Sequence, residues 1–359
     1  MNFMYLLNST KLIKTMTQKE NYQTPPTNSQ LPEDPSRGLR EQILGFRNTQ
    51  LIAVAAKLNI AEHLKNGAKD SKALSSVVDA DPIALYRMMR ALSSLGVFKE
   101  NSDRTFSNNE ASELLMDSTS GSMRNIAILY GEPWLWSAYG SLMESIKTGK
   151  AAFEHVHGKG MYTFFETDSD AATIFKKAMS AFSDIESNAL INAYDFSSKN
   201  IVVDIGGGEG TLVDSLIKAY PNLSGIVFDL LAIDNTDNSS EKKISYVRGD
   251  FFNEVPKDGD IYLLKSVLHN WDDDSCIRIL KNCRTAMHSR SSLLVIERVI
   301  PEIGTKSDSK LFDINMLVMV GGQERTEDQY RRILRDAGFT LMRVIPTQSS
   351  MSIVEAIPE

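Results

Sequence analysis

Hydrophobic residues recur at helical spacing through the first third of the chain, from about residue 38 to residue 120. In LIAVAAKLNIAEHL, residues 51–64, apolar positions follow one another every three or four residues, which is typical of an amphipathic helix. A later helix is predicted to begin near Pro82, because proline suits a first turn, and to end at Gly96. The segment VFKENSDRTFSNNE then predicts two short strands around a polar turn. Helices followed by a hairpin predict a winged-helix-like α-helical domain over residues 38–120.

The segments on either side of this region have different patterns. Residues 1–37 are polar and rich in Pro, Ser, Thr, Asn and Gln. We expect them to form a disordered N-terminal arm, because so few apolar side chains cannot offset the entropy of ordering. Residues 121–198 predict linking helices with long apolar faces that are dense in aromatic residues and methionine. Such faces form ordinary core or line a ligand pocket, and the pattern by itself favours core.

Strand and helix patterns alternate over residues 199–359. This alternation predicts an α/β domain with a mostly parallel, doubly wound, Rossmann-like sheet that has helices on both faces. The predicted strands lie in KNIVVDIGGG, SGIVFDL, ISYVRGD, DIYLLKSVLHNW, SSLLVIERVI, LMRVIPT and MSIVEAI. The fourth is the longest, and we expect it to run as a strand to His269.

The charge balance bears on the class of partner. A formal net charge of -7 at pH 7 argues against nucleic acid as the main partner, because phosphate binding needs concentrated Lys and Arg. The winged-helix pattern still leaves a DNA-binding alternative open, since its third helix and wing carry Arg87, Arg90, Lys99 and Arg104. Acidic residues lie among these four, so they form no basic face, and a structural or dimerisation role is favoured.

The cysteines and the apolar runs bear on the cellular compartment. Cys276 and Cys283 lie two turns apart on one predicted helix, too far for a disulfide between them, and we expect both in the core. No stretch approaches the roughly 18 apolar residues of a membrane span. The chain is therefore predicted to be a cytoplasmic protein without membrane contact.

A glycine-rich motif, DIGGGEG, follows the first predicted strand of the α/β domain and precedes a helix. It places Asp204, Gly206, Gly208 and Gly210 at D-x-G-x-G-x-G spacing. Dinucleotide sites use G-x-G-x-x-G instead. The tighter spacing resembles the first motif of S-adenosylmethionine-dependent methyltransferases, whose cofactor has no phosphate for the loop to hold.

Two acidic residues end the next two predicted strands. Asp229, in GIVFDL, is placed to hold ribose hydroxyls. Asp250, in VRGDFF, is placed to accept from an adenine amine with Phe251 alongside. A glycine loop together with acids at successive strand ends is a far more specific pattern than the loop alone.

His269 follows the apolar run of the longest predicted strand. Ligands bind beyond the carboxyl ends of strands in open α/β sheets, so this histidine is expected to face the cofactor crevice. Its ordinary pKa, about 6.5, suits a general base near neutral pH. Methyl transfer to oxygen needs such a base, because a hydroxyl is a poor nucleophile until its proton is removed.

From about residue 39 onward the chain resembles the class of O-methyltransferases that includes plant caffeic acid O-methyltransferase and bacterial polyketide O-methyltransferases. The matching pieces, in the order typical of that family, are VVDIGGGEG, FDL, GDFF, LLKSVLHNWDDDSCIRIL, LLVIERVIP and GGQERTEDQYRRILRDAGF. They cover nearly all of the predicted catalytic domain. Many relatives have His-Asp-Trp where this chain has His269, Asn270 and Trp271.

The resemblance implies roles residue by residue. His269 is implied as the general base, with Glu297 and Glu324 flanking and orienting its imidazole. The implied S-adenosylmethionine contacts are Ser183, Asp204, Gly206, Gly208, Asp229, Leu230, Asp250, Phe251 and Lys265. The implied lining of the acceptor pocket is Trp136, Phe175, Met179, Trp271, Met316 and Met319. The N-terminal domain is implied to form a homodimer, the acceptor is implied to be a hydroxyl of an aromatic or polyketide-like small molecule, and no metal is needed.

Each of these assignments has an alternative. Glu297 could be solvated at a strand end, Glu324 could pair with Arg325 or Arg331 at the surface, and Lys265 could be a charge on an edge strand. For the whole chain, one alternative is an enzyme of the same fold that binds S-adenosylmethionine without consuming it and acts as a hydroxylase, decarboxylase or pericyclase. A winged-helix regulator and a metal-dependent methyltransferase are less favoured.

Overall fold

The computed structural model describes residues 35–230 and 243–359, and the chain divides into two compact units, Met1–Gly45 and Phe46–Glu359. Most of the predicted N-terminal arm lies outside the described residues. Within the first unit, helix α1 (Pro35–Ile43) takes up the last three residues of that arm. Pro35 is the first residue of this helix, a position that proline tolerates because the first turn needs no backbone donor.

The second unit begins with short helices and a two-stranded hairpin around a common core that includes Ile60, Leu74, Met89 and Phe106. These elements are α2 (Phe46–Lys57), α3 (Ile60–His63), α4 (Ser71–Val78), α5 (Pro82–Ser94), β1 (Lys99–Glu100), β2 (Phe106–Ser107) and α6 (Glu110–Glu113). The predicted helical run over residues 51–64 is interrupted at Asn59, whose φ of 53° is left-handed, a conformation that asparagine tolerates. The helix predicted between Pro82 and Gly96 is present, and Asp81 caps its start through the amides of Ile83 and Ala84.

Helices alone connect this region to the sheet. They are α7 (Arg124–Tyr130), α8 (Pro133–Gly140), α9 (Leu142–Thr148), α10 (Ala152–His157), α11 (Met161–Thr167) and α12 (Ser169–Ala193). The longest, α12, packs against α7 and α13 (Thr211–Ala219). One face of α12 carries Phe175, Met179, Ser183 and Glu186 at intervals of three or four residues. Side chains from the predicted acceptor set and the predicted cofactor set thus share one face of α12.

A seven-stranded sheet forms the rest of the second unit, in the order β10-β11-β7-β6-β3-β4-β5. Its strands are β3 (Ile201–Ile205), β4 (Ser224–Asp229), β5 (Ile244–Arg248), β6 (Ile261–Lys265), β7 (Ser292–Glu297), β10 (Phe339–Pro346) and β11 (Ser352–Pro358). The five strands from β7 to β5 pair in parallel, whereas β11 pairs antiparallel with both β7 and β10. The predicted mostly parallel α/β sheet is therefore confirmed.

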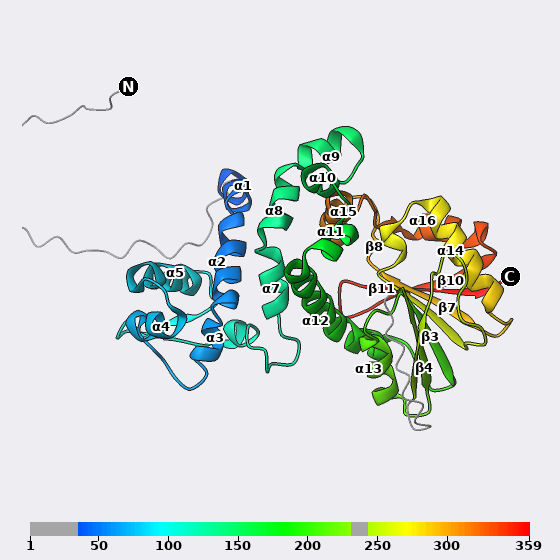
Figure 1. Cartoon of the computed structure of the whole chain (residues 1–359), viewed down its shortest axis with the longest axis horizontal. Helices are drawn as coiled ribbons and strands as arrows, with labels where there is room; N and C mark the ends of the chain where they lie inside the picture. The colour runs from blue at the N-terminus through cyan, green and yellow to red at the C-terminus, as the bar shows by residue number, and fades with distance from the viewer. Residues whose placement is uncertain (1–34, 231–242) are drawn as a thin grey trace, which may run out of the picture. The chain divides into compact units, whose positions relative to one another are not determined.

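Helices cover both faces of this sheet (Figure 1). On one face, α14 (Asp273–Ala286) and α16 (Glu327–Asp336) contribute to a buried core with β3, β6 and β7. On the other, α13 and the end of α12 form a second core. Helix α15 (Asp308–Met319) follows the short strand β8 (Val299–Ile300) and precedes β9 (Arg325–Thr326) along the chain. The strands β8 and β9 pair with each other. None of the described helices is long and apolar enough to cross a membrane.

The prediction that one long strand runs to His269 is wrong. Strand β6 ends at Lys265, Ser266 takes a left-handed φ of 56°, and His269 lies in the short 3-10 helix η1 (Leu268–Asn270). The chain turns here because a buried carboxylate, Glu297 at the end of the neighbouring β7, accepts hydrogen bonds from the amides of Val267 and His269. The apolar pattern of the sequence, from which the long strand was predicted, does not indicate such a contact between segments.

Candidate active site

The glycine motif lies at the carboxyl end of β3, the centre of the parallel strands. Gly206, Gly208 and Gly210 all have positive φ, at 73°, 55° and 80°, a region that favours glycine over other residues. The amide of Gly206 donates to the Phe228 carbonyl at 2.7 Å, which ties the loop to β4. The amide of Gly208 donates to the Asp229 carboxylate at 3.1 Å. The predicted loop and the predicted ribose-binding acid are therefore adjacent, with Leu230 exposed beside them.

Asp204 is buried just before the loop. Burial raises the pKa of its carboxyl to about 7, an effect that the charge of Lys265 partly offsets and the charge of Asp229 reinforces. The charges of Lys265, at the end of β6, and of Asp229, at the end of β4, therefore act on Asp204 near the end of β3, at the same edge of the sheet. This is the edge where ligands bind in open α/β folds.

The third predicted acid, Asp250, closes a turn after β5. Its carboxylate accepts from the Phe252 amide at 2.9 Å and from Asn253 Nδ2 at 3.1 Å. The neighbouring Phe251 ring lies close to Gly206 and edge-on to Trp271, with ring centroids 6.2 Å apart. The structure therefore groups Trp271, which sequence reasoning assigned to the acceptor pocket, with the aromatic residues assigned to the cofactor.

Lys265 does not lie on an edge strand, because β6 is central in the sheet. Its ammonium group forms an ion pair with Glu186 Oε2 at 2.6 Å and donates to Ser183 Oγ at 3.2 Å. Both partners come from α12, so this helix is fixed to the sheet next to the glycine loop. Glu186, only 6% exposed, was not identified from the sequence, although it continues the face of α12 that carries Phe175, Met179 and Ser183.

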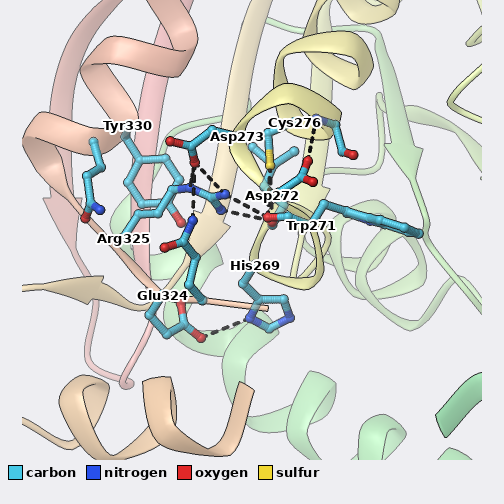
Figure 2. A network of polar contacts seen from close by, with 12 residues as sticks. His269, Trp271, Asp272, Asp273, Cys276, Glu324, Arg325 and Tyr330 are labelled. Atoms are coloured by element: carbon cyan, nitrogen blue, oxygen red, sulfur yellow. Dashed lines mark hydrogen bonds and ion pairs between the residues drawn. The ribbon is translucent and has the colours of Figure 1, made fainter. Parts of the chain in front are cut away.

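His269 and Glu324 form a buried pair. The imidazole Nδ1 lies 2.9 Å from Glu324 Oε1, and His269 is only 6% exposed. Figure 2 shows the two side chains pointing toward each other. The alternative in which Glu324 pairs with an arginine at the surface is therefore wrong. Glu324 Oε2 is buried and has no hydrogen-bond partner in the described structure, so the histidine is the only described partner of this carboxylate side chain.

The pKa of His269 reflects opposing effects. Burial is the largest effect and lowers the pKa, but the hydrogen bond that His269 donates to Glu324 and the charges of Glu297 and Glu324 outweigh it, so the pKa lies above its ordinary value. Nδ1 faces a carboxylate, so the neutral ring carries its proton there and presents Nε2 as the acceptor. No described residue forms a hydrogen bond with Nε2, which leaves this atom for an incoming group.

Glu297 is fully buried, which excludes the alternative of a solvated strand end. Its Oε1 accepts from the amides of Val267 and His269 at 3.0 and 3.1 Å, and its Oε2 accepts from the Tyr330 hydroxyl. Burial raises the pKa of this carboxyl, while the nearby His269 lowers it. Glu297 thus holds the backbone of the histidine turn, and of the two glutamates it is Glu324 that contacts the ring.

A second set of contacts holds the same turn from the other side, and sequence reasoning missed it. The Arg325 guanidinium, fully buried, donates to the carbonyls of Leu268 and Trp271 at 3.0 and 2.7 Å and to the Asp273 carboxylate (Figure 2). Gly322 packs so closely that a Cβ there would lie 2.1 Å from the His269 carbonyl oxygen. The segment that supplies Glu324 therefore also clamps the main chain of the histidine.

Apart from Trp271, which packs with Phe251 in another cluster, the predicted acceptor residues fall into one hydrophobic cluster and its margin. Trp136, Phe175, Met179 and Met319 belong to the same cluster of α8, α10, α12 and α15, and Met316 is buried one turn before Met319 on α15. The Trp136 indole donates to the Tyr130 carbonyl at 2.6 Å. Among residues 35–230 and 243–359, no three histidine, cysteine or acidic side chains are grouped closely enough to hold a metal ion.

Comparison with known proteins agrees with this architecture. Residues 41–118 match the model of the O-methyltransferase dimerisation domain, and residues 139–340 match that of the O-methyltransferase domain. The chain belongs to this family of class I S-adenosylmethionine-dependent O-methyltransferases, the type that includes the caffeic acid and polyketide enzymes.

Relatives span almost the whole chain. The phenazine O-methyltransferase PhzM of Lysobacter antibioticus is 36% identical over 89% of this chain and 95% of its own length. The S-adenosylhomocysteine-bound crystal structure of CalO1, a methyltransferase of calicheamicin biosynthesis, is 29% identical with a TM-score of 0.80 and covers 90% of this chain and 98% of that one. The phenazine-1-carboxylate N-methyltransferase of Pseudomonas aeruginosa is 29% identical over 89% of this chain and 96% of its own length. The family therefore includes enzymes that methylate nitrogen as well as oxygen.

Proposed function

We propose that this protein transfers a methyl group from S-adenosylmethionine to a hydroxyl of an aromatic or polyketide-like small molecule, with His269 as the general base. The observation that carries the proposal is the buried pair of His269 and Glu324, in a turn whose Val267 packs against Gly206 of the glycine loop. The pair orients an imidazole whose Nε2 has no partner among the described residues.

The residues at the strand ends fit the cofactor. Asp229 presents a carboxylate suited to ribose hydroxyls, and Asp250 with Phe251 is suited to an adenine ring. Ser183 and Lys265, joined by a 3.2 Å hydrogen bond, supply donors for a carboxylate. Gly206 and Gly208 have a positive φ, which favours glycine, and because glycine has no Cβ atom the loop can approach a ligand closely. The bound cofactor would supply an electrophilic methyl group on a sulfonium.

In this proposal the chain's own groups prepare the acceptor. His269 Nε2 would take the hydroxyl proton as the acceptor oxygen forms its bond to the methyl group, which S-adenosylmethionine would supply, leaving as neutral S-adenosylhomocysteine. Glu324 stabilises the imidazolium that results, while Glu297, Gly322 and Arg325 keep its main chain in place. The aromatic and methionine side chains of α12 and α15 exclude water and position the acceptor. No step requires a metal.

The dimerisation-domain match supports a homodimer in which residues 38–120 supply the contact surface. The DNA-binding alternative loses support, because Arg90 stacks over Tyr86 at 5.5 Å and Tyr86 donates to Glu100 within the same surface. The alternative of a same-fold enzyme that leaves the cofactor intact would not need a histidine paired with a buried carboxylate. Methylation of nitrogen is the second candidate, favoured by the N-methyltransferase among the relatives.

The experiment is a transfer assay with S-adenosylmethionine that carries an isotopically labelled methyl group. The acceptors are matched pairs of phenols and anilines together with hydroxylated polyketides, and mass spectrometry locates the label. Labelled ethers from the phenols support the proposal. Label on nitrogen alone, or an altered acceptor without label while the cofactor stays intact, would overturn it, provided that calorimetry confirms cofactor binding in the same samples.

A further inference from the structure

Arg298 lies directly between β7 and β8, at the sheet edge that carries the candidate active site. It is only 8% exposed, and the mechanism above gives it no task. Buried charges are costly unless they are paired and hydrogen-bonded, so a guanidinium in this position needs an explanation.

The protein satisfies this guanidinium poorly. No hydrogen bond from it to any described residue exists, although its planar fork carries five N–H donors. Its one ion pair, to Glu186 Oε1, is long at 3.6 Å, whereas Lys265 approaches the other oxygen of the same carboxylate to 2.6 Å. The Glu186 carboxylate therefore forms ion pairs with both Lys265 and Arg298, and Arg298 is the more distant of the two. The Arg298 nitrogens are not among the fully buried polar atoms without a hydrogen-bond partner in the described chain, so they are not sealed from solvent.

The surroundings of Arg298 belong to the acceptor side of the site. Its guanidinium lies 3.8 Å from the centre of the Phe312 ring, and the His269 imidazole stacks nearly parallel to that ring with centroids 6.4 Å apart. Burial raises the pKa of Tyr130 on α7, and the charge of Arg298 partly offsets this, so the phenol is also within electrostatic reach. The same charge lowers the pKa of His269, against the effect of the two glutamates.

The two carboxylate oxygens of Glu186 face different cations. Its Oε2 faces Lys265, which interacts with Asp204 and Ser183 beside the glycine loop. Its Oε1 faces Arg298, which interacts with Phe312, Tyr130 and His269. The lysine is thus on the cofactor side of this carboxylate and the arginine is on the acceptor side.

We propose that Arg298 binds a carboxylate of the acceptor, so that the preferred substrates are aromatic acids that carry the hydroxyl to be methylated. This inference rests on the proposed function and narrows its substrate class. A guanidinium fork matches a carboxylate in a two-hydrogen-bond geometry, and an aromatic acceptor suits the adjacent Phe312 ring. The bound acid supplies the hydrogen-bond acceptors that the protein does not.

The test compares hydroxybenzoic and hydroxynaphthoic acids with their methyl esters, using wild type, Arg298→Gln, Arg298→Lys and, as a matched control, Arg332→Gln at an exposed arginine. Wild type is expected to favour the acid by about 10- to 100-fold in kcat/KM, mainly through KM, as a charge-assisted double hydrogen bond implies. Arg298→Gln should lose that preference but retain turnover of the esters, and Arg298→Lys should keep part of it. The fold should tolerate the change, because Glu186 remains paired with Lys265.

A binding arm separates this inference from the function on which it rests. Calorimetry measures the affinity of the acids for protein saturated with S-adenosylhomocysteine, and separately the affinity for the cofactor product itself. Loss of acid binding in Arg298→Gln with unchanged cofactor binding supports the inference even if no acceptor in the panel is methylated. Methylation without preference for the acid, an acid preference that survives Arg298→Gln, or loss of cofactor binding in that variant would each overturn it.

Discussion

Exchange of Glu324 for glutamine tests the buried pair with little change of shape. Glutamine keeps an acceptor oxygen for His269 Nδ1 but removes the charge. The other carboxylate oxygen of Glu324 has no hydrogen-bond partner among the described residues, so the new amide breaks no second described contact. The structure therefore permits the charge to be removed almost in isolation.

The expected effect follows from the hydrogen bond at 2.9 Å. A hydrogen bond to a charged group contributes about 1.5–3 kcal/mol, and this contribution grows when the imidazole becomes charged as it accepts the proton. Loss of most of it predicts a decrease in kcat of about 10- to 100-fold at high pH, where His269 is neutral in both proteins. An exposed glutamate, Glu327, provides the matched control, and Glu327→Gln should leave kcat unchanged.

The pH profiles give a second readout with a fixed sign. In wild type the pKa of His269 is raised, so kcat/KM should fall as the pH decreases through a value above the ordinary 6.5. In Glu324→Gln the pKa should drop, because burial lowers it and one of the two opposing carboxylates has been removed. The acidic limb of the profile should then move to lower pH, and NMR titration of the five histidines should show one resonance that moves with it.

Stability should respond in the same direction. A raised histidine pKa stabilises the fold most below the unfolded pKa of about 6.5, and this contribution is lost as the pH rises through the folded-state pKa. Glu324→Gln should therefore lower Tm more at pH 6 than at pH 9. If the acidic limb of the pH profile and kcat are both unchanged in Glu324→Gln, Glu324 is not the residue that orients the imidazole and raises its pKa.

Two further predictions concern packing and chemistry. Gly322→Ala should lower kcat by tenfold or more and destabilise the fold by about 2 kcal/mol, because its Cβ would clash with the His269 carbonyl. Gly140→Ala, with open space around its Cβ, should change neither kcat nor stability. Kinetics and denaturant unfolding measure both variants, and equal behaviour of the two would contradict the close packing of Gly322 against His269. Cys276 and Cys283 are buried, and burial raises the pKa of each thiol to about 12, so a thiol reagent at pH 8 should modify neither in native protein and both in denaturant. Rapid modification of the native protein would disprove that burial.

Sequence reasoning succeeded where a residue's role follows from its neighbours in the chain. The glycine loop, Asp229 and Asp250 stand at predicted strand ends, and parallel strands bring their carboxyl ends to one edge. The structure places these residues where the periodicity of the chain predicts them. The helix between Pro82 and Gly96 also follows from local signals at its two ends.

Contacts between distant segments were harder to infer. His269 was expected at the end of a long strand, but the strand stops at Lys265, because Glu297 accepts from two amides of the following turn. Arg325 was considered only as a surface partner of Glu324, yet it is fully buried against main-chain carbonyls more than fifty residues away in sequence. Neither hydrophobic periodicity nor motif spacing records which buried donor meets which carbonyl.

The same limit applied to Glu186 and Arg298. Glu186 lies on the face of α12 that sequence spacing defines, but only the fold shows that two cations share its carboxylate. Arg298 follows a catalytic glutamate candidate in the family's pattern, and nothing in that pattern indicates a buried guanidinium that forms no hydrogen bond with the described residues. Such residues are recognised in the fold by their unsatisfied hydrogen-bond donors, and sequence motifs do not indicate them.

The most direct test of the account is a single-turnover comparison of wild type and His269→Ala. Both proteins are saturated with methyl-labelled S-adenosylmethionine and mixed with the best acceptor, and labelled ether is followed over time. The account predicts a rate at least about a hundredfold lower in His269→Ala, with unchanged affinity for S-adenosylhomocysteine, as expected for loss of a general base. An equal rate in the two proteins would contradict the central claim that His269 removes the acceptor proton.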